Sequence, residues 1–175
     1  MIKTIVVPTD GSEHANKAVL LASDIAEKYG ARLVLLHVLL RGGLSGEMKH
    51  MAEVEHLAER EGAAGAPFAA NIPAAAARLL HDARADEAPR RVYEKIGRLI
   101  LDNAETTARK AGVEQIKSAL EDGEAAQQIL DCAEREGANL IVMGSRGLGA
   151  VKGLLMGSVS HKVTQLAPCT CVTVK

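Results

Sequence analysis

The chain has 175 residues, of which 47% are hydrophobic and 25% charged, a composition that is typical of a folded globular protein and excludes a disordered or fibrous chain. Its 21 basic and 22 acidic residues give a net charge of -1, without the basic excess expected of a nucleic-acid-binding protein. Aromatic residues make up only 2%, so platforms for stacking single-stranded bases are almost lacking, and we expect one domain with an aliphatic core.

The first forty residues predict a strand, a helix and a second strand. An apolar, β-branched run at residues 2–7 predicts a buried strand. Apolar residues then recur every three or four positions over residues 15–29, which predicts a helix that Ser12 caps and Gly30 ends. Residues 32–39 are again continuously aliphatic. Two strands that are apolar on both faces and joined by a helix are typical of a βαβ unit with parallel strands.

An irregular insertion is expected at residues 41–85. A charged, helical stretch at residues 47–61 is followed by an uncharged Ala/Gly/Pro tract at residues 62–77. Two interpretations are open: an arm that covers a site or meets a partner, or a tolerated excursion on the surface at a sheet edge. We assign no chemistry to this stretch.

The rest of the chain alternates between predicted helices and strands. A long helix begins at residues 86–89 and ends before Gly112, and its inward face is expected at Val92, Ile96, Leu99, Ile100, Asn103, Thr107 and Ala111. The later elements are a strand at 115–121, a helix at 124–136, a strand at 139–143, a helix at 157–166 and a strand at 170–174. In the helix at 124–136, the inward residues are expected to be Ala126, Ile129, Leu130 and Ala133. Five strands alternating with helices predict a single α/β domain over residues 1–175, with a mostly parallel sheet covered on both faces.

A glycine pattern follows the strand at residues 139–143. Gly144 and Gly147 are followed by Gly157-Ser158, a G-x2-G-x9-G-S spacing. Glycines after a strand let the backbone approach an anion closely, and the N-terminus of the next helix offers unpaired N–H groups to phosphate. In an open parallel sheet, residues 8–10 at the end of the first strand lie beside this loop. The pattern predicts a phosphate-binding edge.

These residues closely resemble the universal stress protein family. The resemblance rests on residues 8–12, 141–147, 157–160 and 167–169, and it covers the chain except the insertion. It implies an open, doubly wound, Rossmann-like α/β fold of five parallel strands in the order 3-2-1-4-5. It also implies a homodimer paired through the last strand, residues 170–174.

The resemblance also implies a site for adenine nucleotide, ATP or AMP, with Mg²⁺ accompanying ATP. Asp10 corresponds to the carboxylate near the ribose and any metal. The adenine side is expected at Pro8, Thr9 and Val38, the first loop at Met143, Gly144, Arg146 and Gly147, and the second at Gly157, Ser158, Val159 and Ser160. Considered without the resemblance, Asp10 is equally consistent with a turn or cap residue, and Arg146 with a solvated surface residue.

The leading functional hypothesis is a stress-response regulator that works as a nucleotide-dependent switch and serves a client protein that the sequence does not identify. One alternative is a slow, metal-dependent ATP hydrolase, against which stand the missing G-x4-G-K-[ST] loop and the lack of a second carboxylate near Asp10. The other is an interaction scaffold that uses residues 41–85 and ignores nucleotide.

The remaining polar residues predict no further chemistry. His37 and His161 are expected to be structural, and no metal site is predicted. Cys132, Cys169 and Cys171 are too few for a disulfide framework, and we expect free thiols. No leader-like N-terminus and no apolar run of membrane-spanning length occurs in the sequence, so the expected location is the cytoplasm, with no membrane partner.

Overall fold

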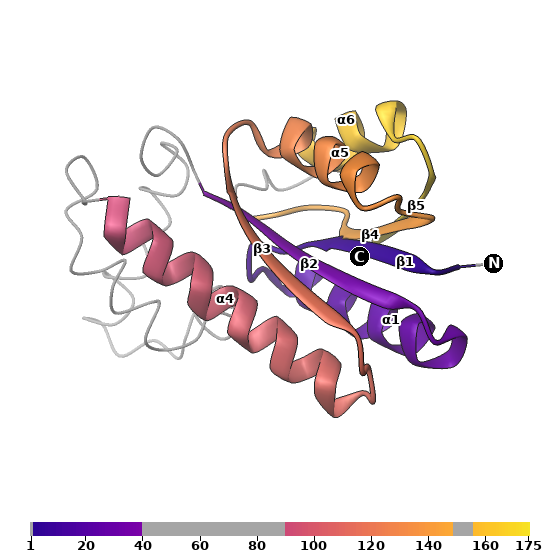
Figure 1. Cartoon of the computed structure of the whole chain (residues 1–175). Coiled ribbons are helices and arrows are strands. Elements are labelled where there is room, and N and C mark those ends of the chain that lie inside the picture. The colour runs from indigo at the N-terminus through magenta and orange to yellow at the C-terminus, as the bar shows by residue number, and fades with distance from the viewer. Residues whose placement is uncertain (1, 40–89, 149–155) are drawn as a thin grey trace.

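Five parallel strands form one sheet in the order β3-β2-β1-β4-β5, as expected (Figure 1). The structure is a computed structural model that describes residues 2–39, 90–148 and 156–175. In chain order its elements are β1 (Thr4–Pro8), α1 (Glu13–Tyr29), β2 (Arg32–Leu39), α4 (Arg90–Lys110), β3 (Ile116–Asp122), α5 (Ala125–Arg135), β4 (Leu140–Gly144), α6 (Ser158–Leu166) and β5 (Thr170–Val174). The predicted insertion at residues 41–85 and the predicted helix start at residues 86–89 lie outside the described residues.

The central strand β1 pairs on both sides. Thr4 to Pro8 run in register with Arg32 to Leu36 of β2, while Ile5 and Val6 pair with Leu140 and Ile141 of β4. From β1 the chain builds the sheet toward β2 and β3, and it then returns to add β4 and β5 on the opposite side. The strand order therefore reverses between β1 and β4, the place where open α/β sheets leave a crevice at the carboxyl ends of their strands.

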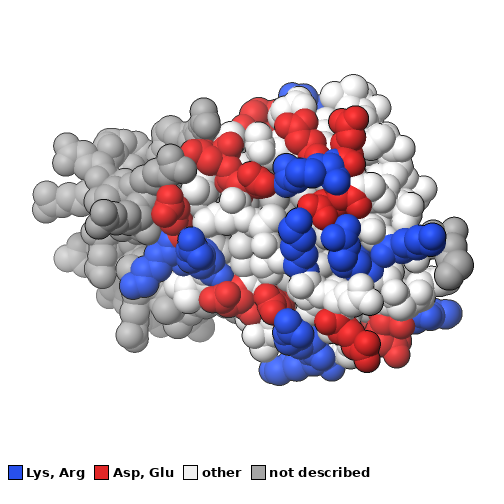
Figure 2. All heavy atoms as spheres, in the orientation of Figure 1, with Lys and Arg blue, Asp and Glu red and all other residues white. Residues whose placement is uncertain are grey.

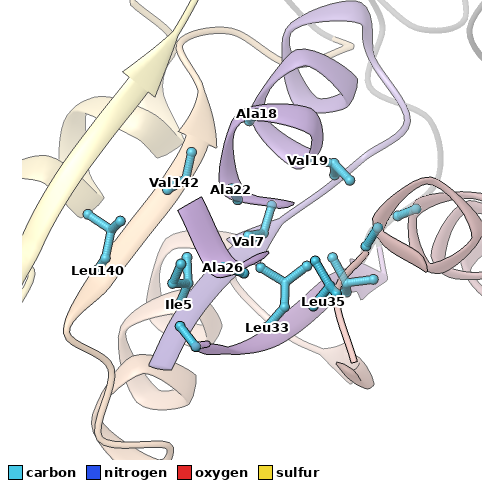
Figure 3. Close-up of a cluster of buried hydrophobic side chains, with 14 of the residues drawn as sticks. Ile5, Val7, Ala18, Val19, Ala22, Ala26, Leu33, Leu35, Leu140 and Val142 are labelled. Atoms are coloured by element: carbon cyan, nitrogen blue, oxygen red, sulfur yellow. The ribbon is translucent and has the colours of Figure 1, made fainter. Parts of the chain in front are cut away.

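Two aliphatic cores fill the space on the two faces of the sheet. Ile5, Val7, Leu33 and Leu35 point toward α1 and α4, and Figure 3 shows them packed with the alanines on the inner face of α1. The intervening residues of β1 and β2 point instead toward α5 and α6. Every residue of Val6–Val7 and Leu33–Leu36 is fully buried, as expected for strands covered on both faces.

The caps of α1 follow the prediction. The Oγ of Ser12 accepts a hydrogen bond from the backbone N–H of Ala15 at 3.3 Å, and Gly30 ends the helix with φ 62°. The backbone N–H of Gly30 donates to the carbonyls of Ala26 and Glu27. The contacts at both ends satisfy backbone groups that a helix end leaves unpaired. The predicted bounds of β2 and β5 also agree with the structure.

The inward faces of two helices differ in part from the prediction. In α4, Asn103 is exposed and Thr107 only half-buried, while Ala104 and Ala108 are buried against the sheet. In α5, Cys132 is fully buried and Leu130 is half-buried. Small residues let a helix approach the sheet closely, so Ala104, Ala108 and Cys132 join the buried isoleucines and leucine of these helices in the core.

Strands β1, β3 and β4 each start one or two residues later than predicted and end one residue later. At the starts of β1 and β4 a side chain satisfies the backbone. The Oδ1 of Asn139 accepts hydrogen bonds from the backbone N–H groups of Lys3 and Thr4, at 2.8 and 3.1 Å. Strand β1 therefore starts at Thr4 rather than residue 2, and β4 at Leu140 rather than residue 139. Strand β3 starts at Ile116, one residue later than predicted.

Candidate functional site

Asp10 joins the end of β1 to the turn that follows β4. Its Oδ1 accepts the backbone N–H of Ser12 at 3.0 Å, and its Oδ2 accepts the backbone N–H of Leu148 at 2.9 Å. The two segments are far apart in sequence, and both follow strands at the point where the strand order reverses. The carboxylate therefore fixes the position of residues 145–148 at the mouth of the crevice.

Gly147 lies directly against this carboxylate. A Cβ placed on Gly147 would overlap Oδ2 of Asp10. This side-chain oxygen is held in place by the hydrogen bond from the backbone N–H of Leu148. Any larger residue at position 147 would push Asp10 and the turn apart. The glycine is thus required by a close approach, and its requirement depends on Asp10.

Ser145 connects the turn to three other elements. Its backbone N–H donates to the carbonyl of Val174 in β5 at 2.7 Å, and its carbonyl accepts the N–H of Gly157 at 2.8 Å. The Ser160 hydroxyl donates to the same carbonyl at 2.7 Å, and the Oγ of Ser145 is 3.0 Å from Nδ1 of His14 in α1. Only 1% of Ser145 is exposed. These bonds hold both glycine loops and β5 together at one buried residue.

The N-terminus of α6 opens next to these bonds. Gly157 is the N-cap and provides no side-chain hydrogen bond, in contrast to Ser12 at α1 and Glu124 at α5. The first-turn N–H groups of a helix have no partner within the helix, and they carry partial positive charge. Ser158 and Val159 are exposed there. The arrangement is suited to an anion.

Thr9, which follows β1, and His37 of β2 form the floor of the candidate site. Thr9, which is 5% exposed, donates its backbone N–H to the carbonyl of Leu36 at 2.8 Å. Its own carbonyl lies 2.8 Å from Nδ1 of His37. Because a carbonyl only accepts, Nδ1 carries a proton. Burial lowers the pKa of His37, against the opposing effects of this bond and of Asp10, so the ring is neutral near pH 7.

The structure places the predicted site residues at the carboxyl ends of neighbouring strands of the sheet. Asp10, the loop at Met143 to Gly147 and the loop at Gly157 to Ser160 are joined by the bonds described above, and Pro8, Thr9 and Val38 end the two neighbouring strands. Met143 and Ser160 are 3% and 4% exposed, and the Ser160 hydroxyl is used inside the protein. Their side chains face inward, which leaves only backbone atoms of these two residues for a ligand.

Sequence reasoning passed over Ser145 and His14. Ser145 stands between Gly144 and Arg146, two predicted site residues, and directly follows a buried strand. That position could have indicated that it belongs to the site. No pattern in the sequence pairs it with His14, because 131 residues separate the two. In the described ranges, no three His, Cys, Asp or Glu side chains gather to hold a metal ion. All three cysteines have free thiols.

Residues 1–175 match the universal stress protein family throughout. The chain belongs to this family. A universal stress protein of Thermus aquaticus is 34% identical, with 100% of both chains covered. The universal stress protein YxiE of Bacillus subtilis is 43% identical over 86 residues, a match that spans 49% of this chain and 57% of the relative.

Solved structures of other universal stress proteins have the same fold. One, in complex with cAMP, has a TM-score of 0.63 at 23% identity and covers 99% of this chain and 97% of its own. Another, from Archaeoglobus fulgidus in complex with dAMP, has a TM-score of 0.62 at 18% identity, with 100% and 98% covered. Among the described helices of this universal stress protein, none combines the length and apolarity needed to cross a membrane.

Proposed function

We propose that this universal stress protein binds an adenine nucleotide, ATP or AMP, at the carboxyl ends of β1 and β4. We further propose that the bound nucleotide acts as a switch that changes the surface presented by a homodimer in a stress response. Two proteins of the same fold are known in complex with cAMP and dAMP, which supports an adenine nucleotide as ligand. A ligand drives such a switch when its affinity differs between two states of the protein.

The observation that carries the proposal is the convergence of two loops at the switch point of the sheet. The turn at residues 145–148 is held by Asp10, and it is linked through Ser145 to the uncapped N-terminus of α6. Backbone N–H groups and a helix N-terminus beside a strand-order reversal are the features that bind phosphates in open α/β sheets.

Each predicted residue then has a role on one side of the ligand. Pro8, Thr9 and Val38 border the adenine, with Val38 acting through its backbone. Asp10 is near the ribose, and Mg²⁺ accompanies ATP. The phosphates meet two loops, whose residues are Met143, Gly144, Arg146 and Gly147 in the first and Gly157, Ser158, Val159 and Ser160 in the second. Both carboxylate oxygens of Asp10 already accept backbone N–H groups, which does not favour a role as catalytic base in ATP hydrolysis.

Strand β5 is the edge we propose for pairing two copies. Within the described sheet it pairs with β4 alone, in parallel over Thr170 to Val174. The backbone N–H of Ser145 donates to the carbonyl of Val174. A displacement of the first loop is therefore transmitted to β5 through this hydrogen bond. The Ser145 bond therefore offers a route by which ligand at the loops alters the dimer edge.

Calorimetric titration with ATP, ADP and AMP, with and without magnesium, tests the proposal. Acid release and mass measurement identify any nucleotide that co-purifies. We expect Ser158→Ala to weaken AMP binding about tenfold, the effect of losing one hydrogen bond to a charged group. Gly147→Val is expected to abolish binding, because a side chain there displaces Asp10 and the turn.

Ser118→Ala is the matched control. Ser118 is exposed on β3 and bonds Glu105 of α4 at 3.0 Å, far from the β1–β4 edge in the sheet order. The affinity of the Ser118→Ala protein for AMP should equal that of the unsubstituted protein. Unchanged affinity in both Ser158→Ala and Gly147→Val, in variants shown to be folded, would refute the assigned site.

A further inference from the structure

His14 occupies a position beside the predicted phosphate loop that the family resemblance does not assign. It lies in the first turn of α1, half-buried, with its Nδ1 3.0 Å from the Oγ of Ser145. Arg146 is the next residue after Ser145 in the same turn. A titratable ring is thereby attached to the segment that carries the loop arginine.

The charges around His14 come from each element that packs against it. Glu13 and Lys17 belong to α1, and they neutralise one another in an ion pair at 2.7 Å. Asp10 follows β1, and Arg146 follows β4. Burial lowers the pKa of His14, and the positive charges of Arg146 and Lys17 add to this effect, while Glu13 and Asp10 oppose it. The ring is neutral near pH 7 and titrates in acid.

The hydrogen bond to Ser145 survives a change in protonation. A serine hydroxyl both donates and accepts. It donates to Nδ1 when the neutral imidazole carries its proton on Nε2, and it accepts from Nδ1–H when the proton is on Nδ1 or the ring is charged. Protonation therefore does not break the contact that holds the turn, and the cost of charging the ring depends chiefly on the neighbouring charges.

We propose that His14 takes up a proton when an anionic ligand binds beside Arg146, so that the affinity for nucleotide phosphate rises as the pH falls below neutrality. The inference rests on the proposed function and adds a proton to it. An anion that offsets the charge of Arg146 removes a repulsion from the imidazolium. By linkage, protonated His14 must strengthen anion binding by the same factor.

Titration of the intact protein with cAMP between pH 8 and pH 5.5 tests this. The phosphodiester of cAMP keeps one negative charge over this range, so a pH dependence reports the protein. We expect the affinity to rise about three- to tenfold toward pH 5.5. Adenosine, which carries no phosphate, should bind with a pH-independent affinity. By NMR, the His14 ring should titrate at higher pH with cAMP bound, but not with adenosine.

Two histidine variants localise the effect. His14→Gln keeps an amide able to bond Ser145 but cannot titrate, so cAMP binding should persist without pH dependence. His161→Gln removes an exposed ring on α6 and should retain the full pH dependence. The inference is wrong if His14→Gln keeps the dependence, if His161→Gln loses it, or if the NMR titration of His14 ignores cAMP. Failure of every nucleotide to bind at any pH would overturn the proposed function, and this inference with it.

Discussion

Gly97 in α4 shows how closely one helix approaches the floor of the site. A Cβ on Gly97 would lie 2.7 Å from Cδ1 of Leu120 and 2.8 Å from Cδ2 of His37. Leu120 is half-buried and has a flexible end, but the ring of His37 is held by its bond to the Thr9 carbonyl. The absence of a side chain at position 97 therefore allows His37, and through it Thr9, to take its place.

We predict that Gly97→Ala destabilises the protein by about 1 kcal/mol. Alanine is the better helix former by about 1 kcal/mol, but overpacking a filled site costs about 1–3 kcal/mol. Urea unfolding measures the difference. Arg98→Ala, at the exposed neighbouring position, should change stability by less than about 0.5 kcal/mol. A Gly97→Ala protein more stable than the parent would show that the His37 ring moves freely.

At the residue scale, local signals were predictable and long-range ones were not. The Ser12 cap and the Gly30 stop follow from preferences that act within one helical turn. Glu124 caps α5 by accepting the N–H groups of Ala126 and Gln127, although glutamate is not a favoured cap. Its carboxylate also bonds Lys162 of α6 at 3.0 Å, a partner that only the folded chain supplies.

At the scale of elements, Glu136 ties α5 to two strands. Its side chain is 6% exposed and bonds Lys117 of β3 at 2.7 Å and Arg32 of β2 at 3.1 Å. Figure 2 shows basic and acidic side chains interleaved on the face that carries β3, α4 and α5, without a broad area of one sign. The charges on this face pair elements with one another.

We predict that Glu136→Gln destabilises the protein by about 1–2 kcal/mol at pH 7. The hydrogen bond from Lys117 is the main cause that lowers the pKa of Glu136, so the carboxylate stabilises the folded state above the pKa of the unfolded chain. This contribution is lost as the pH falls through the lowered, folded-state pKa. The difference between the parent and Glu136→Gln should therefore shrink as the pH is lowered below about 4.5 in urea unfolding.

Glu134→Gln is the matched control for this prediction. Glu134 is exposed on the same helix, and the described part of the chain gives it no ion pair. The stability of the Glu134→Gln protein should match that of the parent at every pH. Equal stability of Glu136→Gln and Glu134→Gln at pH 7 would contradict the role of Glu136.

Most elements could be predicted from the sequence because periodicity reports burial. The bounds of β2 and β5 agree with prediction because their apolar runs end sharply, whereas β3 is half-exposed and its start was shifted by one residue. The edge that holds the candidate site was predictable from the glycine spacing and Asp10. The bonds from Ser145 to His14 and to Val174 depend on how separate elements dock, which no local pattern encodes.

At the scale of the whole molecule, the outer edge of β5 makes a specific prediction about assembly. The carbonyl of Val174 faces Ser145 and β4, so by strand alternation the backbone N–H of Thr173 points away from the sheet. We expect sedimentation to give twice the mass of one chain. Thr173→Pro removes that outward N–H and should give monomers, because proline cannot donate to a paired strand.

Thr173→Val serves as the control, since it keeps the backbone N–H and should remain dimeric. If the parent protein sediments as a monomer, or if Thr173→Pro remains a dimer, the two copies do not pair through β5. Nucleotide titration of the same samples would show whether assembly and binding are coupled, as the Ser145 bond to Val174 suggests.

The position of β1 in the middle of the sheet has a consequence for how the protein is made. Its β4 neighbour comes late in the chain: Thr4 and Asn139, which bond at the junction of the two strands, are 135 residues apart. During synthesis β1, α1 and β2 can assemble as a unit, but the backbone N–H and C=O groups of β1 that pair with β4 have no partner until β4 has left the ribosome. Long-range parallel pairing of this kind slows folding and exposes the chain to aggregation. The nascent protein is therefore most exposed to aggregation just before the two strands that carry its candidate site can pair.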